Sequence, residues 1–194
     1  VLGLRGIKEP TPEQLSNETR RAAAQFIPEG EKWMAVSPGT LFVVAAGNEG
    51  SDNDAMPTFP ANVRVNNSIT VAATNGISKL AKFSNYGAKS VDIAAPGVAI
   101  VSSVPALDQK QLLPMSGTSM AAPYIAGVAA KMKEINPRLS SHDLKKMLML
   151  TVDRKDWLKG KVLSEGLVNP ERAYSASEKS KSMSLDEAIK LAQN

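Results

Sequence analysis

The chain contains several short apolar segments that are bounded by glycine or by polar residues. Residues 41–46 read L-F-V-V-A-A and lie between Gly39 and Gly47. A continuous apolar run of this length is typical of a strand that is buried on both faces. Further short strands are expected at residues 68–73, 91–94 and 98–104. Strands of this kind, with helices between them, predict a parallel sheet in a layered α/β fold.

Helix start signals occur at both ends of the chain. Residues 11–14 read T-P-E-Q, which has the form of a capping box with proline at the first helical position, and they predict a helix over residues 12–26. A long helix is expected over residues 119–135, ended by N-P at residues 136–137. Three further N-cap signals, at Ser140, Asn169 and Ser184, each predict another helix.

The stretch between the last two predicted helices is rich in serine and lysine. Residues 175–182 read S-A-S-E-K-S-K-S, a composition typical of a flexible linker. We therefore expect residues 1–174 to form the body of the domain. Residues 175–194 would then be a linker followed by an amphipathic helix.

Composition limits the chemistry that this chain can perform. Its 194 residues are 43% apolar, enough for one ordinary domain that buries roughly 70% of its unfolded surface. The absence of cysteine from the sequence excludes disulfides, thiolate metal sites and cysteine nucleophiles. The sequence has one histidine, His142, and no apolar run near the ~18 residues that a membrane helix needs. It starts V-L-G-L-R-G, which is neither a signal peptide nor a Met start, so we expect a processed chain or a fragment.

The positive net charge of +4 is concentrated in the last third of the chain. Residues 131–194 hold 13 basic and 9 acidic side chains, whereas the first 130 residues hold 10 of each. A basic tail can bind nucleic acid or anionic lipid. Here the lysines are dispersed among acids and lack the interleaved aromatic residues that stack on bases. The pattern favours a solvated helical surface, so neither a nucleic acid nor a membrane is expected as a partner.

Residues 116–123 read S-G-T-S-M-A-A-P and pass from a glycine-containing loop into a predicted helix. Ser119 would lie at the helix N-terminus, where unpaired N–H groups and the helix dipole favour negative charge. A serine nucleophile needs such a setting because its attack produces an oxyanion. Pro123 would fall in the first turn, where its missing N–H costs little. The plainer alternative is that Ser119 or Thr118 is only a helix N-cap.

Residues 45–50 read A-A-G-N-E-G and follow the first predicted strand directly. In open α/β sheets, ligand clefts form outside the carboxyl ends of the strands. The side-chain amide of Asn48 could donate a hydrogen bond to an oxyanion there. The alternative is an ordinary Asn-Glu-Gly turn.

Together, A-A-G-N-E-G at residues 45–50 and G-T-S-M-A-A-P at residues 117–123 resemble the subtilisin-like serine proteases, the subtilases. The blocks between and after them resemble that family in the same order: F-P-A at 59–61, I-T-V-A-A-T at 69–74, K-F-S-N-Y-G at 82–87, D-I-A-A-P-G-V at 92–98 and E-G-L-V-N-P-E-R-A at 165–173. The resemblance covers about residues 41–173. It implies an α/β fold, the C-terminal portion of the parallel-sheet, three-layer subtilisin-like catalytic domain.

The resemblance also implies the roles of individual residues. Ser119 would be the nucleophile, and the Asn48 side chain would bind the oxyanion together with the backbone N–H of Ser119. Ala45, Ala46 and Gly47 would line one wall of the pocket for the substrate residue before the scissile bond.

Two further implications concern the segment after the oxyanion residue. Thr58 would lie near the floor of the same pocket. The bond between Phe59 and Pro60 would be cis, the alternative being an ordinary trans turn.

The general base of such an enzyme is missing from this sequence. In the family, an Asp motif and a His motif precede the serine, and neither occurs here. The substrate-pairing Ser-Leu-Gly-Gly type of segment is absent too, unless V-L-G at residues 1–3 is a poor remnant of it. His142 is expected in the first turn of a helix, where its neighbour Asp143 points elsewhere and cannot orient it. We expect His142 to be an exposed surface residue, and Asp92 and Asp108 are no better candidates for these roles. The chain alone is therefore expected to be inactive.

The strand from Leu41 to Ala46 would normally pair with a strand of the missing half. Alone, it would be a flat apolar edge, which is an aggregation hazard. The expected partners are a polypeptide substrate and the N-terminal half that carries Asp and His, in the same protein or in a separate chain. Self-association through this edge is the alternative.

One loop contains candidate ligands for a metal ion. Ser51, Asp52, Asn53 and Asp54 offer hard oxygen atoms that could bind calcium. The three carboxylate and amide side chains among them are too few for a tight site, so a solvated loop is expected. No cofactor is assigned, and calcium remains a candidate only for the intact enzyme.

The sequence thus indicates the C-terminal part of a secreted or periplasmic serine endopeptidase that cleaves peptide bonds through an acyl-enzyme. The alternatives are a catalytically inactive, peptide-binding relative, a structural fragment, or a hydrolase of esters and other amides.

Overall fold

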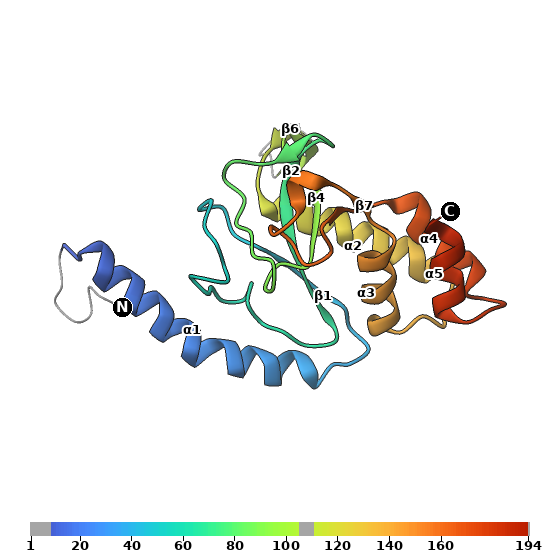
Figure 1. Ribbon diagram of the computed structural model, residues 1–194, viewed down its shortest axis with the longest axis horizontal. Helices are drawn as coiled ribbons and strands as arrows, with labels where there is room; N and C mark the ends of the chain where they lie inside the picture. Colours follow the sequence, from blue (N-terminus) through green and yellow to red (C-terminus); the bar gives the residue numbers. More distant parts are fainter. Residues whose placement is uncertain (1–8, 105–110, 194) are drawn as a thin grey trace.

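The computed structural model describes residues 9–104 and 111–193, and its centre is a mostly parallel sheet (Figure 1). The strands of this sheet are β1 (Phe42–Ala45), β2 (Ser68–Asn75), β3 (Lys79–Leu80), β4 (Ile93–Pro96), β7 (Asp153–Arg154) and β8 (Gly166–Leu167). Their order is β1-β2-β4-β8-β7, with β3 paired to β2. The neighbours β1, β2, β4 and β8 run parallel, while β3 and β7 pair antiparallel. The predicted parallel α/β sheet is confirmed.

Helices lie on both faces of the sheet. They are α1 (Pro12–Ala35), α2 (Thr118–Ile135), α3 (Ser141–Leu150), the 3₁₀ helix η2 (Asp156–Leu158), α4 (Pro170–Lys179) and α5 (Leu185–Gln193). They cover the two faces unequally, because α2 to α5 pack on one face and, among the described helices, only η2 and the end of α1 contribute to the other. Along β1, Leu41, Val43 and Ala45 pack against the large cluster that contains α2. Val44 and Phe42 belong to another cluster, together with Met34 near the end of α1. The alternation of side chains along a strand thus places α1 and α2 on opposite faces of β1. No helix in the described ranges is both long and apolar enough to cross a membrane.

The first helix is longer than expected. The sequence predicted an end near residue 26 because Pro28 and Gly30 usually interrupt helices. Instead, α1 continues through both residues to Ala35. Gly30 is buried, and a Cβ there would lie 2.7 Å from the Phe59 ring and 2.8 Å from Val63. Close packing against these residues therefore overrides the local preference.

The expected flexible linker at residues 175–182 is wrong. α4 extends to Lys179, and both Ala176 and Ser177 are fully buried. The Ser177 hydroxyl donates to the Ala173 carbonyl at 2.8 Å, which satisfies a polar side chain inside the helix. The boundary expected at residue 174 falls inside α4, and α5 packs on α3 and α4. The hydrophilic composition of residues 175–182 gave a wrong prediction because small serine and alanine side chains also suit close helix packing.

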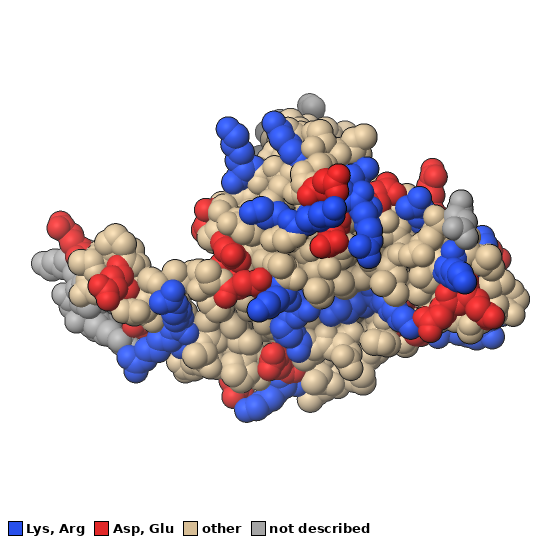
Figure 2. All heavy atoms as spheres, in the orientation of Figure 1, with Lys and Arg blue, Asp and Glu red and all other residues tan. Residues whose placement is uncertain are grey.

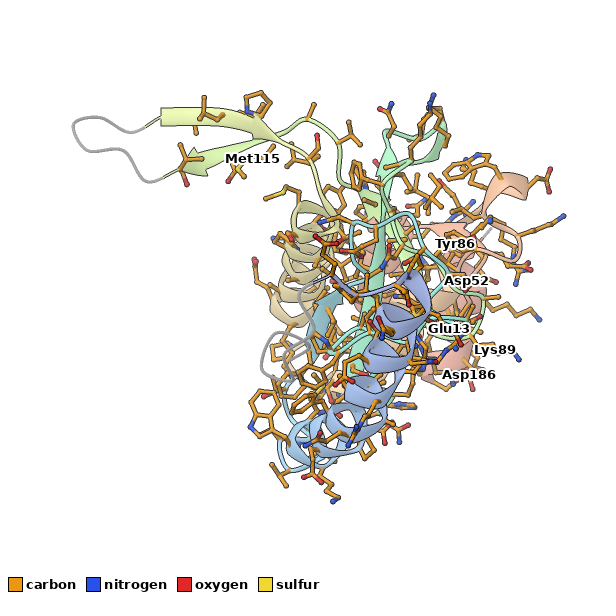
Figure 3. The ribbon with its side chains drawn as sticks, turned by 90° about the vertical axis from the view of Figure 1, so that its left-hand side faces the viewer. Glu13, Asp52, Tyr86, Lys89, Met115 and Asp186 are labelled. Carbon is orange, nitrogen blue, oxygen red and sulfur yellow. The ribbon has the colours of Figure 1, made fainter. Side chains whose placement is uncertain are left out.

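A β-hairpin projects from the body (Figure 3), formed by β5 (Ile100–Val104) and β6 (Gln111–Met115). The sequence predicted the first strand but missed the second, which contains Pro114. Leu112, Leu113 and Met115 on β6 are exposed.

Charged side chains of both signs are mixed on the face shown in Figure 2. Ion pairs within the described residues include Lys146 with Asp186, and Lys131 with Glu134 at 2.9 Å.

Candidate active site

The segments that carry the two sequence motifs meet at the carboxyl ends of the parallel strands. The A-A-G-N-E-G loop begins at the end of β1, and Gly97 follows β4. The N–H of Gly97 donates to the Thr74 carbonyl at 3.0 Å, and the N–H of Gly117 donates to the Gly97 carbonyl at 2.8 Å. These bonds fix the N-terminus of α2 against the sheet edge where clefts form in parallel sheets.

Asn48 is held in one orientation by Thr118. Its Oδ1 accepts the backbone N–H of Thr118 at 2.9 Å and the Thr118 hydroxyl at 3.0 Å. The Gly47 N–H donates in turn to Thr118 Oγ1 at 3.2 Å. Because a backbone N–H needs an oxygen acceptor, the amide oxygen must face Thr118 and the amide nitrogen must face away. Sequence reasoning considered Thr118 only as a cap and missed this orienting role.

Two N–H donors flank a small space beside Gly117. The point where a Cβ of Gly117 would stand is 3.6 Å from Asn48 Nδ2 and 3.7 Å from the backbone nitrogen of Ser119. Neither donor has a hydrogen-bond partner among the described residues. Two convergent donors without partners, at the start of a helix, make a site suited to a negatively charged oxygen.

The helix begins one residue before Ser119. Gly117 is the N-cap of α2 and has no side-chain cap, while Thr118 and Ser119 are the first two helical residues. The interpretation of Ser119 or Thr118 as a plain N-cap is therefore wrong. Ser119 is exposed, as a nucleophile must be. Pro123 was expected in the first turn, but it is the sixth helical residue, so the Ser119 carbonyl lacks its helical N–H donor.

The expected pocket residues differ in exposure. Ala45 and Gly47 are half-buried beside Asn48, whereas the Ala46 side chain is fully buried in the core and does not reach the surface. Thr58 is half-buried, and its N–H donates to Asn62 Oδ1 at 2.9 Å.

The resemblance correctly implied that the peptide bond before Pro60 is cis. The Phe59–Pro60 bond is cis, and the exposed Phe59 ring contacts Phe26 with a centroid separation of 6.0 Å.

His142 lies far from Ser119 along the sheet. It is exposed in the first turn of α3, and the neighbouring Ser141 hydroxyl donates to the Pro38 carbonyl just before β1. Ser119 lies at the opposite, carboxyl end of the strands. The carboxylate of Asp143 instead accepts the Ser140 N–H at 2.9 Å, as a helix cap does. His142 is thus a surface residue away from Ser119, as expected.

Asp92 is a structural anion at the start of β4, again at the other end of the sheet. It is only 1% exposed, and it accepts Arg64 Nη1 at 2.9 Å and the Thr70 N–H at 2.7 Å. The Lys145 ammonium is 3.8 Å away. Burial lowers the pKa of Lys145, and the adjacent Asp92 carboxylate opposes that shift. Asp108 lies outside the described residues.

The acidic loop after Asn48 uses its carboxylates internally. Asp54 accepts the N–H groups of Lys89 at 3.0 Å and Ser90 at 2.9 Å, while Asp52 Oδ1 accepts the Asp54 N–H. Across residues 9–104 and 111–193, no group of three or more His, Asp or Glu side chains is arranged to hold a metal ion.

Comparison with known families agrees with the geometry. A model described as the subtilase family matches residues 7–181. The chain belongs to the subtilase family. The subtilase-type proteinase psp3 of Schizosaccharomyces pombe is 42% identical over 127 residues, which cover 65% of this chain and 27% of that protein. The alkaline elastase YaB of a Bacillus species is 40% identical over 139 residues, or 72% of this chain and 34% of that protein. The extracellular basic protease of Dichelobacter nodosus is 38% identical over 149 residues, or 71% and 23%.

Solved structures support the same fold. The A-subunit of the AB5 toxin from E. coli superposes with a TM-score of 0.67 at 29% identity, covering 81% of this chain and 57% of that chain. A cold adapted subtilisin-like serine proteinase gives a TM-score of 0.52 at 34% identity, covering 68% and 44%. This subtilase chain therefore has a partial subtilisin-like fold, and it spans about a quarter to a third of the three curated relatives above.

Proposed function

We propose that this chain is the C-terminal portion of a serine endopeptidase domain, with Ser119 as the nucleophile. The observation that carries the proposal is the pair of N–H donors beside Gly117, from Asn48 and Ser119, next to an exposed serine hydroxyl. Ser119 Oγ would attack the scissile carbonyl, whose oxygen becomes negatively charged. The two donors and the positive end of α2 would stabilise that charge. The scissile C–N bond would then break, and the leaving amine would take the proton that the general base had removed from Ser119. Water would later hydrolyse the acyl-enzyme.

The general base would be a histidine outside this 194-residue sequence, oriented by an aspartate. We propose that both belong to an N-terminal segment that adds to β1, in the same polypeptide or in a second one. Self-association through this edge is the competing occupant.

The open edge of β1 supports this partner. The N–H groups of Phe42 and Ala46 donate to the Asn67 and Val71 carbonyls of the β2 side. The alternate residue Val43 therefore turns its N–H outward, where a further parallel strand can pair. Among the described strands, β1 pairs with β2 alone.

An apolar groove beside this edge supports the same partner. It has a volume of about 240 Å³ between β1 and α2. Its apolar lining includes Leu41, Val43, Ala126, Ala130 and Leu144. The alanines are exposed on α2 and are small enough for close packing with another element.

The substrate would be a polypeptide, with Ala45, Gly47 and Thr58 near the residue before the scissile bond. The proposed chemistry is carried by side chains and backbone groups and assigns no step to a cofactor. We also propose that the protein is exported, because the matching protease of D. nodosus is extracellular by name. Cell fractionation of the source organism tests this point.

A fluorophosphonate probe, read by intact-mass spectrometry, tests the nucleophile. Labelling is expected when the chain is combined with its base-carrying segment, and it should be lost in Ser119→Ala. The matched control is Ser116→Ala, which removes a nearby exposed hydroxyl that accepts the Ala99 N–H and should leave labelling intact. Labelling that persists in Ser119→Ala would overturn the proposal. Peptide binding without labelling would support a non-catalytic role, and turnover of small esters alone would support a different hydrolase.

A further inference from the structure

Asn85 lies beneath the Asn48 loop, in the segment between β3 and β4, and it is fully buried. Its Oδ1 accepts the backbone N–H groups of Glu49 and Ser51, each at 3.0 Å. Its Nδ2 donates to Glu49 Oε2 at 2.8 Å and to Asn53 Oδ1 at 3.1 Å. An amide side chain has two donors and two acceptor lone pairs, so all its hydrogen-bonding capacity is used on this one loop.

The connection reaches Asn48 through Glu49. The same Glu49 Oε2 that accepts from Asn85 also accepts the backbone N–H of Asn48, at 3.0 Å. The backbone N–H of Asn85 adds a bond to the Gly47 carbonyl at 2.9 Å. The main chain on both sides of Asn48 is therefore tied to Asn85.

Gly47 shows how closely the loop lies over this pair. Its φ is +114°, a conformation that favours glycine. A Cβ at this position would collide with Asn85 Nδ2 and would lie 2.7 Å from Glu49 Oε2. The glycine lets the backbone pass directly over the contact between the amide and the carboxylate.

We propose that Asn85, acting through Glu49, is the positioning residue that holds the Asn48 donor beside the Ser119 N–H. The inference rests on the proposed function, because it assumes that these donors stabilise an oxyanion. Thr118 fixes the side-chain amide of Asn48 and Asn85 fixes its backbone, so the donor needs no rearrangement when negative charge develops. Such preorganisation is what makes an oxyanion site effective.

Asn67 is a buried asparagine with a purely structural role, and it serves as a comparison. Asn67 Nδ2 lies 3.0 Å from the carbonyls of Met34 and Ser37 and 3.1 Å from that of Thr40, at the amino end of β1. Asn67 and Asn85 thus secure opposite ends of the same strand, and Asn85 alone adjoins Asn48.

The test is a double-mutant cycle in the enzyme that contains both this chain and its base-carrying segment. Asn85→Asp keeps the size and the acceptor but removes the two donors and faces the Glu49 carboxylate. We expect kcat to fall about 10- to 100-fold with KM little changed, because a small displacement of a catalytic donor is costly. In an Asn48→Ala background, the same substitution should leave kcat unchanged, since no donor remains to be positioned.

A second variant guards against misfolding. Glu49 is exposed, so Glu49→Ala opens no cavity, and it should lower kcat in the same Asn48-dependent way. The control Asn67→Ala should lower the melting temperature and leave kcat unchanged. An equal loss of kcat in both backgrounds, or unchanged kcat in Asn85→Asp and Glu49→Ala, would overturn the inference. Ser119→Ala distinguishes this failure from a failure of the proposed function. If Ser119→Ala keeps its activity, the proposed function is wrong. If Ser119→Ala is inactive, the outcomes above bear on the role of Asn85 alone.

Discussion

Gly117→Ala should impair the proposed oxyanion site while leaving the stability of the fold nearly unchanged. The added methyl would lie 3.6 Å from Asn48 Nδ2 and from Met120 Sδ and 3.7 Å from the Ser119 nitrogen, which are ordinary contact distances. The φ of Gly117 is 161°, extended backbone that alanine can adopt. The variant should fold, with a change in unfolding free energy within about 1 kcal/mol.

The same methyl would occupy the space where the substrate oxygen must accept both hydrogen bonds. Removing one oxyanion donor in a subtilisin costs roughly 10²–10³ in kcat, so blocking two should cost at least about 10³, or about 4 kcal/mol. The assay is steady-state hydrolysis of a peptide substrate by the enzyme that includes the base-carrying segment. Thermal unfolding of the isolated chain measures the effect of the substitution on stability.

Gly127→Ala is the matched control for the unfolding measurement. A Cβ there meets no atom within 4 Å, and alanine is favoured over glycine in a helix by about 1 kcal/mol. This control should therefore raise the melting temperature. A Gly117→Ala enzyme that keeps kcat within about tenfold of the parent would refute the oxyanion assignment.

Three further predictions concern the edge strand and the buried charges. Val43→Pro removes an outward N–H of β1, so the isolated chain should fold but fail to gain fluorophosphonate labelling when its partner segment is added; normal labelling would contradict the proposed pairing. Asp92→Ala should lower the unfolding free energy by about 3–5 kcal/mol in denaturant titrations, because Lys145 and Arg64 lose their buried counter-ion, and a loss below 1 kcal/mol would argue against that role. Because burial lowers the pKa of Lys145 below its ordinary value of 10.5, the unfolded chain binds more protons in the interval between the folded pKa and 10.5. Stability should therefore gain from this group as pH rises through that interval, and Lys145→Met should remove the gain; an identical pH profile in that variant would show that Lys145 contributes nothing.

The sequence predicted those elements whose signals are local. The apolar run at residues 41–46 and the capping signals at Thr11 and Ser140 correspond to β1, α1 and α3. Failures occurred where distant packing decides the outcome. α1 passes Pro28 because residues near its end pack on the sheet, and α4 crosses the expected linker because Ser177 is buried.

The candidate site likewise contains residues that the sequence indicated and residues that it did not. The two motifs, through their resemblance to the subtilases, singled out Asn48 and Ser119 as candidates. The orienting contacts of Thr118 and Asn85 could not be predicted, since they are small sets of hydrogen bonds between residues that are far apart in sequence. No periodicity or composition encodes such a bond. For Ala46, membership of a motif did not reveal that the side chain points into the core.

The projecting hairpin of β5 and β6 is expected to open and close independently of the body of the domain. None of the described side chains of β5 and β6 is buried, and their ladder bonds join only each other. A two-stranded ladder without a core opens at little free-energy cost. Its amide hydrogens should therefore exchange with solvent at rates insensitive to mutations that destabilise the body, whereas those of β2 should follow global unfolding. Met115 is directly followed by the residues that lead into α2, so local opening of the hairpin would reach the Ser119 segment before the rest of the sheet loosens (Figure 3).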